Sequence, residues 1–235
     1  MKPGKLYLIP TILSEGRTDS LPPRLGEVVK HLDYFLVENV RTARRFISSL
    51  DLGVTIQDLE FRKIDKNSSD TEISEALHAV AEGRDGGIMS EAGCPGIADP
   101  GSRLVSLAHD RNIAVIPLVG PSSIFLALMA SGFNGQHFTF HGYLPIDKRE
   151  RAESIRKIEQ LSQREGSTHI FIETPYRNMQ LLSTLLQVCK ATTRICVARD
   201  ITGPDEWIQS APVAQWKGSL PELHKIPAVF LISAT

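Results

Sequence analysis

Short apolar runs alternate with amphipathic runs up to about residue 140, and this alternation constrains the fold more than any other feature of the chain. The apolar runs have strand length, and the runs between them carry apolar side chains at helical spacing. Strands and helices that alternate in this way indicate a parallel or mostly parallel sheet with helices on both faces. We expect strands at Lys5–Ile9, Tyr34–Val37, 59–63, 87–89, 113–116 and 138–141, and helices near 24–32, 41–50, 70–82, 101–111 and 122–131.

The helix expected over 70–82 has the clearest signals. From Ile73 onward its apolar side chains recur at i, i+3, i+4, i+7 and i+8, which places them on one face. Ser69 and Glu72 form a capping-box pattern, which satisfies free amide groups of the first helical turn. Gly83 is expected to end the helix.

The alternation of strand and helix patterns is interrupted at residues 142–149, where Gly142 and Pro145 precede a charged run. We interpret this segment as a linker between an N-terminal α/β domain (1–141) and a C-terminal α+β domain (150–235). Closely spaced strand patterns near the end of the chain favour antiparallel pairing there. In this second half we expect helices at 150–164 and 176–189 and strands at 168–172, 194–198, 206–209, 213–217 and 228–232.

Composition excludes several classes of protein. Lys and Arg number 26 against 27 Asp and Glu, so a basic field over the whole protein is absent and any RNA contact needs a local patch. Three widely spaced cysteines form neither a disulfide framework nor a zinc pattern, which fits a reducing cytoplasm. Because no apolar run approaches the ~18–20 residues of a membrane span, we expect a soluble intracellular protein with no membrane or metal partner.

Residues 90–101, with the sequence SEAGCPGIADPG, connect an expected strand to an expected helix. Three glycines and two prolines exclude helix or strand interior here. One interpretation is an ordinary strand-to-helix turn. The other is a ligand loop, which we favour because most such connections have roughly 2–6 residues.

Two further loops, 119–123 and 173–177, also follow expected strands. In open α/β sheets ligands lie outside the carboxyl ends of strands, so these loops are binding candidates. Ser122 can cap the next helix and leave its first-turn amides free for a ligand, or it can be an ordinary N-cap. The dinucleotide fingerprint, the P-loop and the nucleophile elbow are all missing from the sequence.

Four segments occur in the same order as motifs of the tetrapyrrole methylase superfamily, and the chain resembles its bacterial 16S rRNA cytidine 2′-O-methyltransferase branch most. That branch reads S-D-A-G-T-P-G-I-S-D-P-G where this chain has SEAGCPGIADPG, so nine of twelve letters match. The other motifs are LVGPSS, FHGYLP and IETPYR, and the resemblance extends over roughly residues 5 to 233.

The resemblance implies two α/β domains of the tetrapyrrole methylase type, with S-adenosylmethionine in the cleft between them, and a homodimer. It implies contacts that are largely to main chain, so Cys94 is expected to be a tolerated small residue rather than a nucleophile. Carried over by position, the implied cofactor-binding residues are Ile9, Gly93, Cys94, Pro95, Ile97, Ser122, Ser123, Glu173, Thr174, Ala198 and Pro227.

Methyl transfer from a sulfonium depends chiefly on alignment, although a ribose hydroxyl acceptor would benefit from a general base. The candidate bases are Glu38, Glu91 and Asp99. Two of them have simpler interpretations: Asp99 can cap the helix that begins near Pro100, and Glu38 can pair with Arg41.

Arg41, Arg44 and Arg45 lie on one face of an expected helix. Such a face can hold RNA phosphates through bidentate contacts, or it can simply face solvent. A second basic group, Lys148 to Arg151, is largely offset by neighbouring acids.

The sequence departs from the rRNA branch at two places. The branch has G-T-P-I-G-N-L-x-D at the first strand, where this chain has IPTILSEGRTD, and Gly203 replaces a lysine. The leading hypothesis is a methyltransferase acting on ribosomal RNA or the 30S subunit. The alternatives are a methyltransferase acting on a tetrapyrrole or another small metabolite, and a non-catalytic homologue that binds the cofactor.

Overall fold

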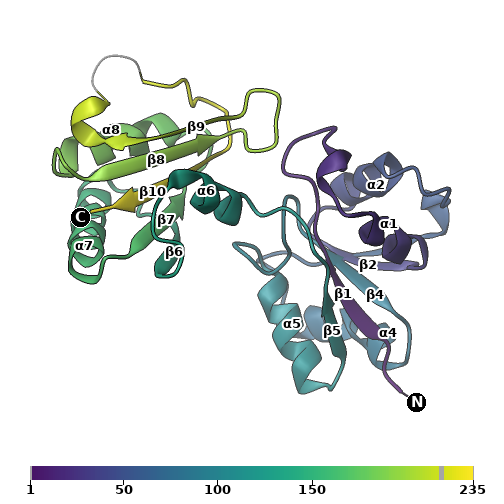
Figure 1. Cartoon of the computed structure of the whole chain (residues 1–235). Coiled ribbons are helices and arrows are strands. Elements are labelled where there is room, and N and C mark those ends of the chain that lie inside the picture. The colour runs from purple at the N-terminus through teal and green to yellow at the C-terminus, as the bar shows by residue number, and fades with distance from the viewer. Residues whose placement is uncertain (1, 217–219, 235) are drawn as a thin grey trace. The chain divides into compact units, whose positions relative to one another are not determined.

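The structure, a computed structural model, describes residues 2–216 and 220–234. The chain divides into two compact units, Met1–Ser122 (unit 1) and Ser123–Thr235 (unit 2), and each has its own sheet. Figure 1 labels most helices and strands of both units.

Unit 1 is built on a parallel sheet in which the described strands follow the order β3-β2-β4-β1-β5. The parallel sheet expected from the sequence is therefore confirmed. The central strands are buried on both faces, as is usual when helices cover a parallel sheet. The strands are β1 (Lys5–Ile9), β2 (Tyr34–Val37), β3 (Glu60–Lys63), β4 (Gly86–Met89) and β5 (Ala114–Pro117).

Helices cover both faces of this sheet because alternate side chains of each strand point to opposite sides. Leu36 and Ile88 pack with one set of helices, whereas Phe35 and Met89 pack with the other. The first set is α3 (Asp70–Ala76), α4 (His78–Ala81) and α5 (Gly101–Asp110), and the second is α1 (Pro23–Lys30) and α2 (Val40–Ser49).

The capping box at the start of α3 is present. The Ser69 hydroxyl accepts a hydrogen bond from the Glu72 amide, and the Glu72 carboxylate accepts one from the Ser69 amide at 2.7 Å. The single helix expected over 70–82 is interrupted at Leu77, so α3 and α4 are separate. Chain reversal follows at Gly83, whose φ of +105° suits glycine.

Unit 2 contains a mixed sheet in which the described strands follow the order β6-β7-β10-β8-β9. β6 and β7 are parallel, whereas β10 is antiparallel to both β7 and β8, and β9 is antiparallel to β8. The antiparallel pairing expected late in the chain is confirmed. The strands are β6 (Phe138–Tyr143), β7 (Thr168–Ile172), β8 (Arg194–Arg199), β9 (Trp207–Pro212) and β10 (Ala228–Ser233).

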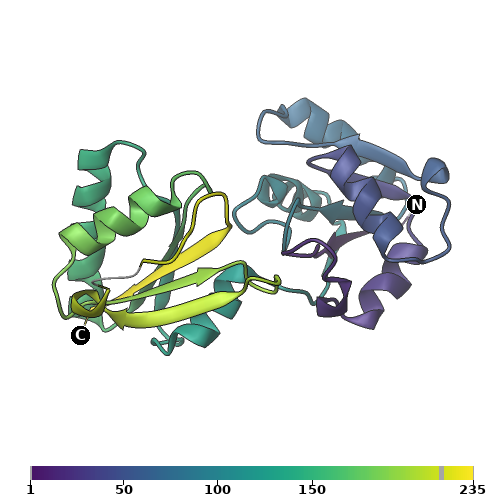
Figure 2. The same cartoon turned by 90° about the horizontal axis from the view of Figure 1, so that it is seen from above.

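Helices also lie on both sides of the second sheet, as Figure 2 shows from above. α7 (Lys148–Glu165) and α8 (Asn178–Val188) pack on Phe171, Val197 and Phe230. α6 (Ser123–Ser131) contacts β8, β9 and β10. The strand expected over 213–217 was wrong: Val213–Gln215 form a 3₁₀ turn, and Lys217 lies outside the described residues.

The division between the units differs from the boundary expected at 142–149. That segment joins β6 to α7 inside unit 2, and β6 pairs with β7. The Gly142 and Pro145 signals therefore mark a connection within one sheet. The structure also has no described helix long and apolar enough to cross a membrane.

Candidate functional site

Three loops meet at the carboxyl edge of the sheet of unit 1. The Thr11 amide, after β1, donates to the Gly93 carbonyl, after β4, at 2.9 Å. Gly120, after β5, lies so close to Pro10 that an added Cβ would stand 2.2 Å from the Pro10 Cβ. β1 lies between β4 and β5, and the chain leaves β1 toward one side of the sheet and β4 toward the other. This is a topological switch point, where open α/β sheets bind ligands.

The loop 90–101 has the unusual backbone that its glycines indicated. Gly93, Gly96 and Ala98 all have positive φ, at 72°, 82° and 62°. One Asp99 oxygen accepts hydrogen bonds from the amides of Gly96 and Gly101, both at 2.7 Å. This carboxyl group therefore ties the loop to the first residue of α5. Burial is the largest influence on Asp99 and raises its pKa, although these hydrogen bonds oppose the shift.

The three candidate bases line one hollow of about 970 Å³, which we call the carboxylate hollow. Glu38 follows β2, and Glu91 and Asp99 follow β4, so the sheet brings them to one edge. The same hollow is also lined by three cations, namely Arg41, Lys63 and Lys66. The Lys63 ammonium pairs with Asp65 at 2.7 Å.

Glu38 is the candidate base that the structure favours. It is half-buried, and burial, followed by the charges of Asp99 and Glu91, raises its pKa. The alternative in which Glu38 pairs with Arg41 is not realised, since no ion pair joins Glu38 to any described residue. Asp99 is occupied by loop amides, and Glu91 is exposed. A carboxylate with a raised pKa binds a proton more readily than an exposed one.

Cys94 is poorly suited to nucleophilic chemistry. Its sulfur lies 3.4 Å from the Pro121 carbonyl oxygen and 3.8 Å from that of Gly120. Burial, together with the charge of Asp99, raises the pKa of the Cys94 thiol. An activated cysteine needs the opposite shift. Its position supports the view of Cys94 as a small residue that links two loops.

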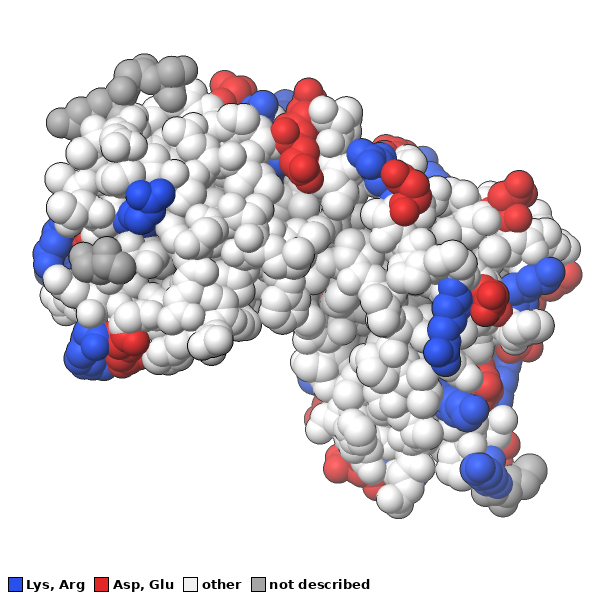
Figure 3. Space-filling model, viewed as in Figure 1, with Lys and Arg blue, Asp and Glu red and all other residues white. Residues whose placement is uncertain are grey.

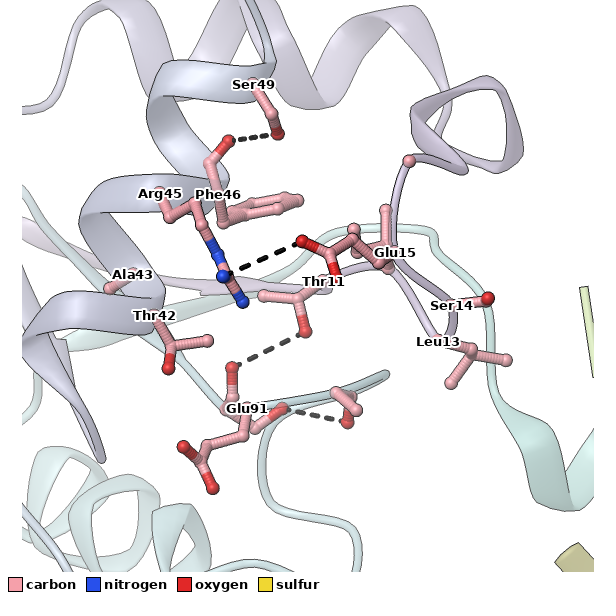
Figure 4. A pocket seen from close by; sticks show the side chains of 14 residues that line it. Thr11, Leu13, Ser14, Glu15, Thr42, Ala43, Arg45, Phe46, Ser49 and Glu91 are labelled. Atoms are coloured by element: carbon pink, nitrogen blue, oxygen red, sulfur yellow. Dashed lines mark hydrogen bonds and ion pairs between the residues drawn. The ribbon is translucent and has the colours of Figure 1, made fainter. Parts of the chain in front are cut away.

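A second, smaller pocket of about 200 Å³ lies beside the carboxylate hollow, and Figure 4 shows its lining. Its walls are the loop 11–16, α2 and residues 90–92, so it belongs wholly to unit 1. Glu91 lines both cavities. Sequence reasoning missed this pocket, although the loop after the first strand was the place where the chain departs from the rRNA branch. Lys63 and Lys66 were missed as well, despite lying at the end of an expected strand.

The three arginines of α2 lie at i, i+3 and i+4 of one helix, as expected, but their side chains have different surroundings. Arg41 lines the carboxylate hollow. The guanidinium of Arg44 stacks over the Phe61 ring, 5.2 Å from its centroid. Arg45 lies at the small pocket, 3.6 Å from the Glu15 carboxylate. Of the three, Arg41 alone faces the hollow that holds the candidate base.

In unit 2, the expected cofactor residues also gather at one sheet edge. Glu173 and Thr174 follow β7, Ala198 lies near the end of β8, and Pro227 precedes β10. The Pro227 carbonyl accepts a hydrogen bond from the Asp200 amide at 2.9 Å, which closes this edge. Ser123 begins α6, immediately after Ser122.

Glu173 has one oxygen engaged and one free. Its Oε1 accepts from the Thr174 amide at 2.6 Å and from two nitrogens of Arg177. Its Oε2 is buried and has no hydrogen-bond partner among the described residues. A buried acceptor without a partner is costly, which suits a site completed by a ligand with amine or hydroxyl donors. S-adenosylmethionine carries such donors, so the residues present fit this cofactor.

In unit 1, the expected cofactor residues lie around the three converging loops. Ile9 ends β1, and Gly93 to Pro95 form the turn after β4. Ile97 is 42% exposed, which is high for an isoleucine and leaves it available to a ligand. The described residues contain no group of three or more His, Cys, Asp and Glu side chains placed to hold a metal ion.

Comparison with known proteins decides the family. A family model described as tetrapyrrole (corrin/porphyrin) methylases matches residues 13–216. The chain belongs to the tetrapyrrole methylase family. The resemblance seen in the sequence motifs is thereby confirmed.

Relatives and solved structures agree with this family. The ribosomal RNA small subunit methyltransferase I of Vibrio cholerae serotype O1 is 29% identical over 89% of this chain and 69% of that protein. The protein of the same name from Escherichia coli O157:H7 is 29% identical over 90% of this chain and 70% of its own length. The crystal structure of the methyltransferase CobJ superposes with a TM-score of 0.65 at 20% identity, covering 99% of this chain and 95% of that one.

A uroporphyrin-III-C-methyltransferase from Thermus thermophilus has the same fold, with a TM-score of 0.57 at 17% identity over 98% of this chain and 94% of that one. These two structures confirm the expected architecture of two α/β domains. Family membership and the methyltransferase relatives identify the chain as an S-adenosylmethionine-dependent methyltransferase.

Proposed function

We propose that this methyltransferase acts on ribosomal RNA of the small subunit, at the 2′-hydroxyl of a cytidine in 16S rRNA. The observation that carries the proposal is the carboxylate hollow, where the half-buried Glu38 lies with Arg41, Lys63 and Lys66. A carboxylate suits the proton of a ribose hydroxyl, and the cations suit the neighbouring phosphates. Relatives named as ribosomal RNA small subunit methyltransferases, similar over most of the chain, support the same substrate class.

The proposed cofactor residues are those expected from the sequence. In unit 1 these are Ile9, Gly93, Cys94, Pro95, Ile97 and Ser122. In unit 2 they are Ser123, Glu173, Thr174, Ala198 and Pro227. When bound, S-adenosylmethionine supplies a methyl group on a positively charged sulfur, already activated for displacement.

Three side chains of this protein have roles in the proposed methyl transfer. Glu38 accepts the hydroxyl proton as the ribose oxygen gains the methyl group, a contribution of about 10²–10⁴-fold in rate. Asp99 holds the loop 94–101 in shape through two backbone amides. Arg41 neutralises phosphate charge. Holding the acceptor and the methyl donor in line supplies the larger part of the acceleration, about 7–11 kcal/mol.

The test is methyl transfer from radiolabelled S-adenosylmethionine to 30S subunits that lack native methylation. Digestion to nucleosides should yield 2′-O-methylcytidine as the labelled product. Binding of S-adenosylhomocysteine without any transfer to 30S subunits would refute the rRNA proposal. Absence of cofactor binding would refute the assignment of the site as well.

A tetrapyrrole bearing carboxylates is the second candidate acceptor, because the cations of the carboxylate hollow suit it equally well. Transfer to such a compound in parallel assays, with none to 30S subunits, would favour this candidate. A protein that binds the cofactor yet methylates neither acceptor would fit a non-catalytic homologue. We also propose a homodimer in the cytoplasm, to be checked by light scattering and by fractionation.

A further inference from the structure

The small pocket beside the carboxylate hollow has no role in the function proposed so far. Its floor is apolar, since Ala43 and Phe46 of α2 are each only 5% exposed. Its rim is polar: Thr42 and Ser49 carry hydroxyl groups, and the ion pair between Arg45 and Glu15 lies at the rim. Figure 4 shows these side chains around the opening.

The size of the pocket limits what it can hold. Its volume of about 200 Å³ is below the roughly 300–1,000 Å³ of clefts that enclose drug-sized ligands. It therefore cannot enclose a molecule as large as S-adenosylmethionine. A cavity of about 150 Å³ is enough to bind benzene. The pocket accordingly has room for a single ring system.

The chemistry of the pocket suits a ring with an apolar face and polar edges. Phe46 and Ala43 offer apolar contact to such a face. At its edge the Thr42 hydroxyl offers a donor and an acceptor, whereas the Ser49 hydroxyl donates to the Phe46 carbonyl at 2.7 Å and offers an acceptor. A nucleobase has this character. Enzymes that do chemistry on a base hold that base in a fitted pocket, out of the helical stack, and the same arrangement would fix the ribose of a nucleotide that is methylated on its 2′-hydroxyl.

The position of the pocket relates it to the reaction. Glu91 lines both the pocket and the carboxylate hollow, so a base in the pocket leaves its ribose beside the hollow that contains Glu38. We propose that this pocket receives the unstacked base of the acceptor nucleotide. This inference rests on the proposed rRNA function. It also assigns a role to the loop 11–16, which forms one wall at the place where the sequence departs from the rRNA branch.

Filling the pocket tests the proposal. Ser49→Trp and Thr42→Phe each place an aromatic ring at a residue that lines it. The matched control is Ser48→Trp: Ser48 is the preceding residue of α2, exposed and outside the pocket lining, and about 100° away around the helix. The measured quantities are kcat/KM for 30S subunits lacking native methylation, the affinity for S-adenosylhomocysteine and the thermal midpoint.

We expect both pocket variants to lower kcat/KM for 30S subunits at least about tenfold relative to the control. Their affinity for S-adenosylhomocysteine should stay within about twofold of the wild type, and their thermal midpoints should match the control, which excludes misfolding. Equal activity of pocket and control variants would overturn the inference while leaving the rRNA function intact. A wild-type protein that methylates no 30S subunits would instead refute the proposed function itself.

Discussion

At the scale of single residues, Glu38 shows how position changes the chemistry of a carboxyl group. The sequence named Glu38, Glu91 and Asp99 as candidate bases, and the structure places all three around the carboxylate hollow. Their relative merit as bases depends on burial and on hydrogen bonds to loop amides. Neither of these can be read from the spacing of residues along the chain.

Replacing Glu38 should change the rate and the stability of the enzyme in opposite directions. Glu38→Gln should lower kcat by about 10²–10⁴-fold because the base is lost. The wild-type kcat should fall as pH drops through the raised pKa of Glu38, and this acid limb should vanish in the variant. A raised pKa means that the folded state binds this proton more tightly than the unfolded state. Glu38 therefore lowers the free energy of unfolding as the pH rises above its pKa in the unfolded state. Glu38→Gln should therefore raise the thermal midpoint at neutral pH.

Glu91→Gln is the companion variant. The charge of Glu91 helps to raise the pKa of Glu38, so its removal should lower that pKa and move the acid limb of kcat to lower pH. The maximal rate should change little. An unchanged limb in Glu91→Gln, or a limb that persists in Glu38→Gln, would exclude Glu38 as the titrating base.

Gly120 lacks a side chain for a steric reason. A Cβ at this position would stand 2.2 Å from the Pro10 Cβ, at the point where the loops after β1 and β5 meet. Gly120→Ala should destabilise the protein by about 1–3 kcal/mol, since overpacking forces backbone to move. Gly135→Ala is the matched control, because an added Cβ there meets nothing within 4 Å. Equal denaturation midpoints for the two variants would contradict the steric argument.

At the scale of elements, the sequence predicted every described strand of unit 1 to within one or two residues. For the central strands β2 and β4, burial on both faces leaves a clear apolar run, which explains why they could be predicted. The strand expected over 213–217 was wrong because an alternating pattern also arises where a chain turns against a core: Val213 begins a 3₁₀ turn and Trp216 follows it, and both are buried. The break of the helix at Leu77 leaves the apolar stripe intact, so periodicity does not reveal it.

The loop 90–101 yields a prediction that distinguishes the two interpretations of Asp99. Asp99→Ala removes the acceptor of two backbone amides, which should lower the free energy of unfolding by about 1–3 kcal/mol. Because the loop loses these two hydrogen bonds, binding of S-adenosylhomocysteine should weaken as well. Asp99→Asn keeps an oxygen in the same place and should retain cofactor affinity and most activity. If Asp99 were the base, Asp99→Asn would lose activity as severely as Asp99→Ala.

At the scale of the whole molecule, the division into units depended on pairing that sequence patterns do not record. The glycine and proline at 142 and 145 resemble a linker, yet β6 pairs with β7 and α6 contacts the same sheet. Both elements therefore belong to unit 2, whose first residue is Ser123. Long-range strand pairing, rather than local composition, sets such a boundary.

The charge of the whole molecule gives the last prediction. Net charge is −1, and in Figure 3 the described basic and acidic side chains are interspersed over the visible face. If the enzyme acts on ribosomal RNA as proposed, electrostatic attraction to RNA must come from a few local cations, and Arg41 in the carboxylate hollow is the candidate to test. Arg41→Gln should weaken binding of 30S subunits and reduce the slope of log affinity against log salt by about one. Arg24→Gln, an exposed arginine of α1, should leave the slope unchanged. Identical slopes for the two variants would exclude a phosphate contact at Arg41, and the carboxylate hollow would then need another source of affinity for RNA.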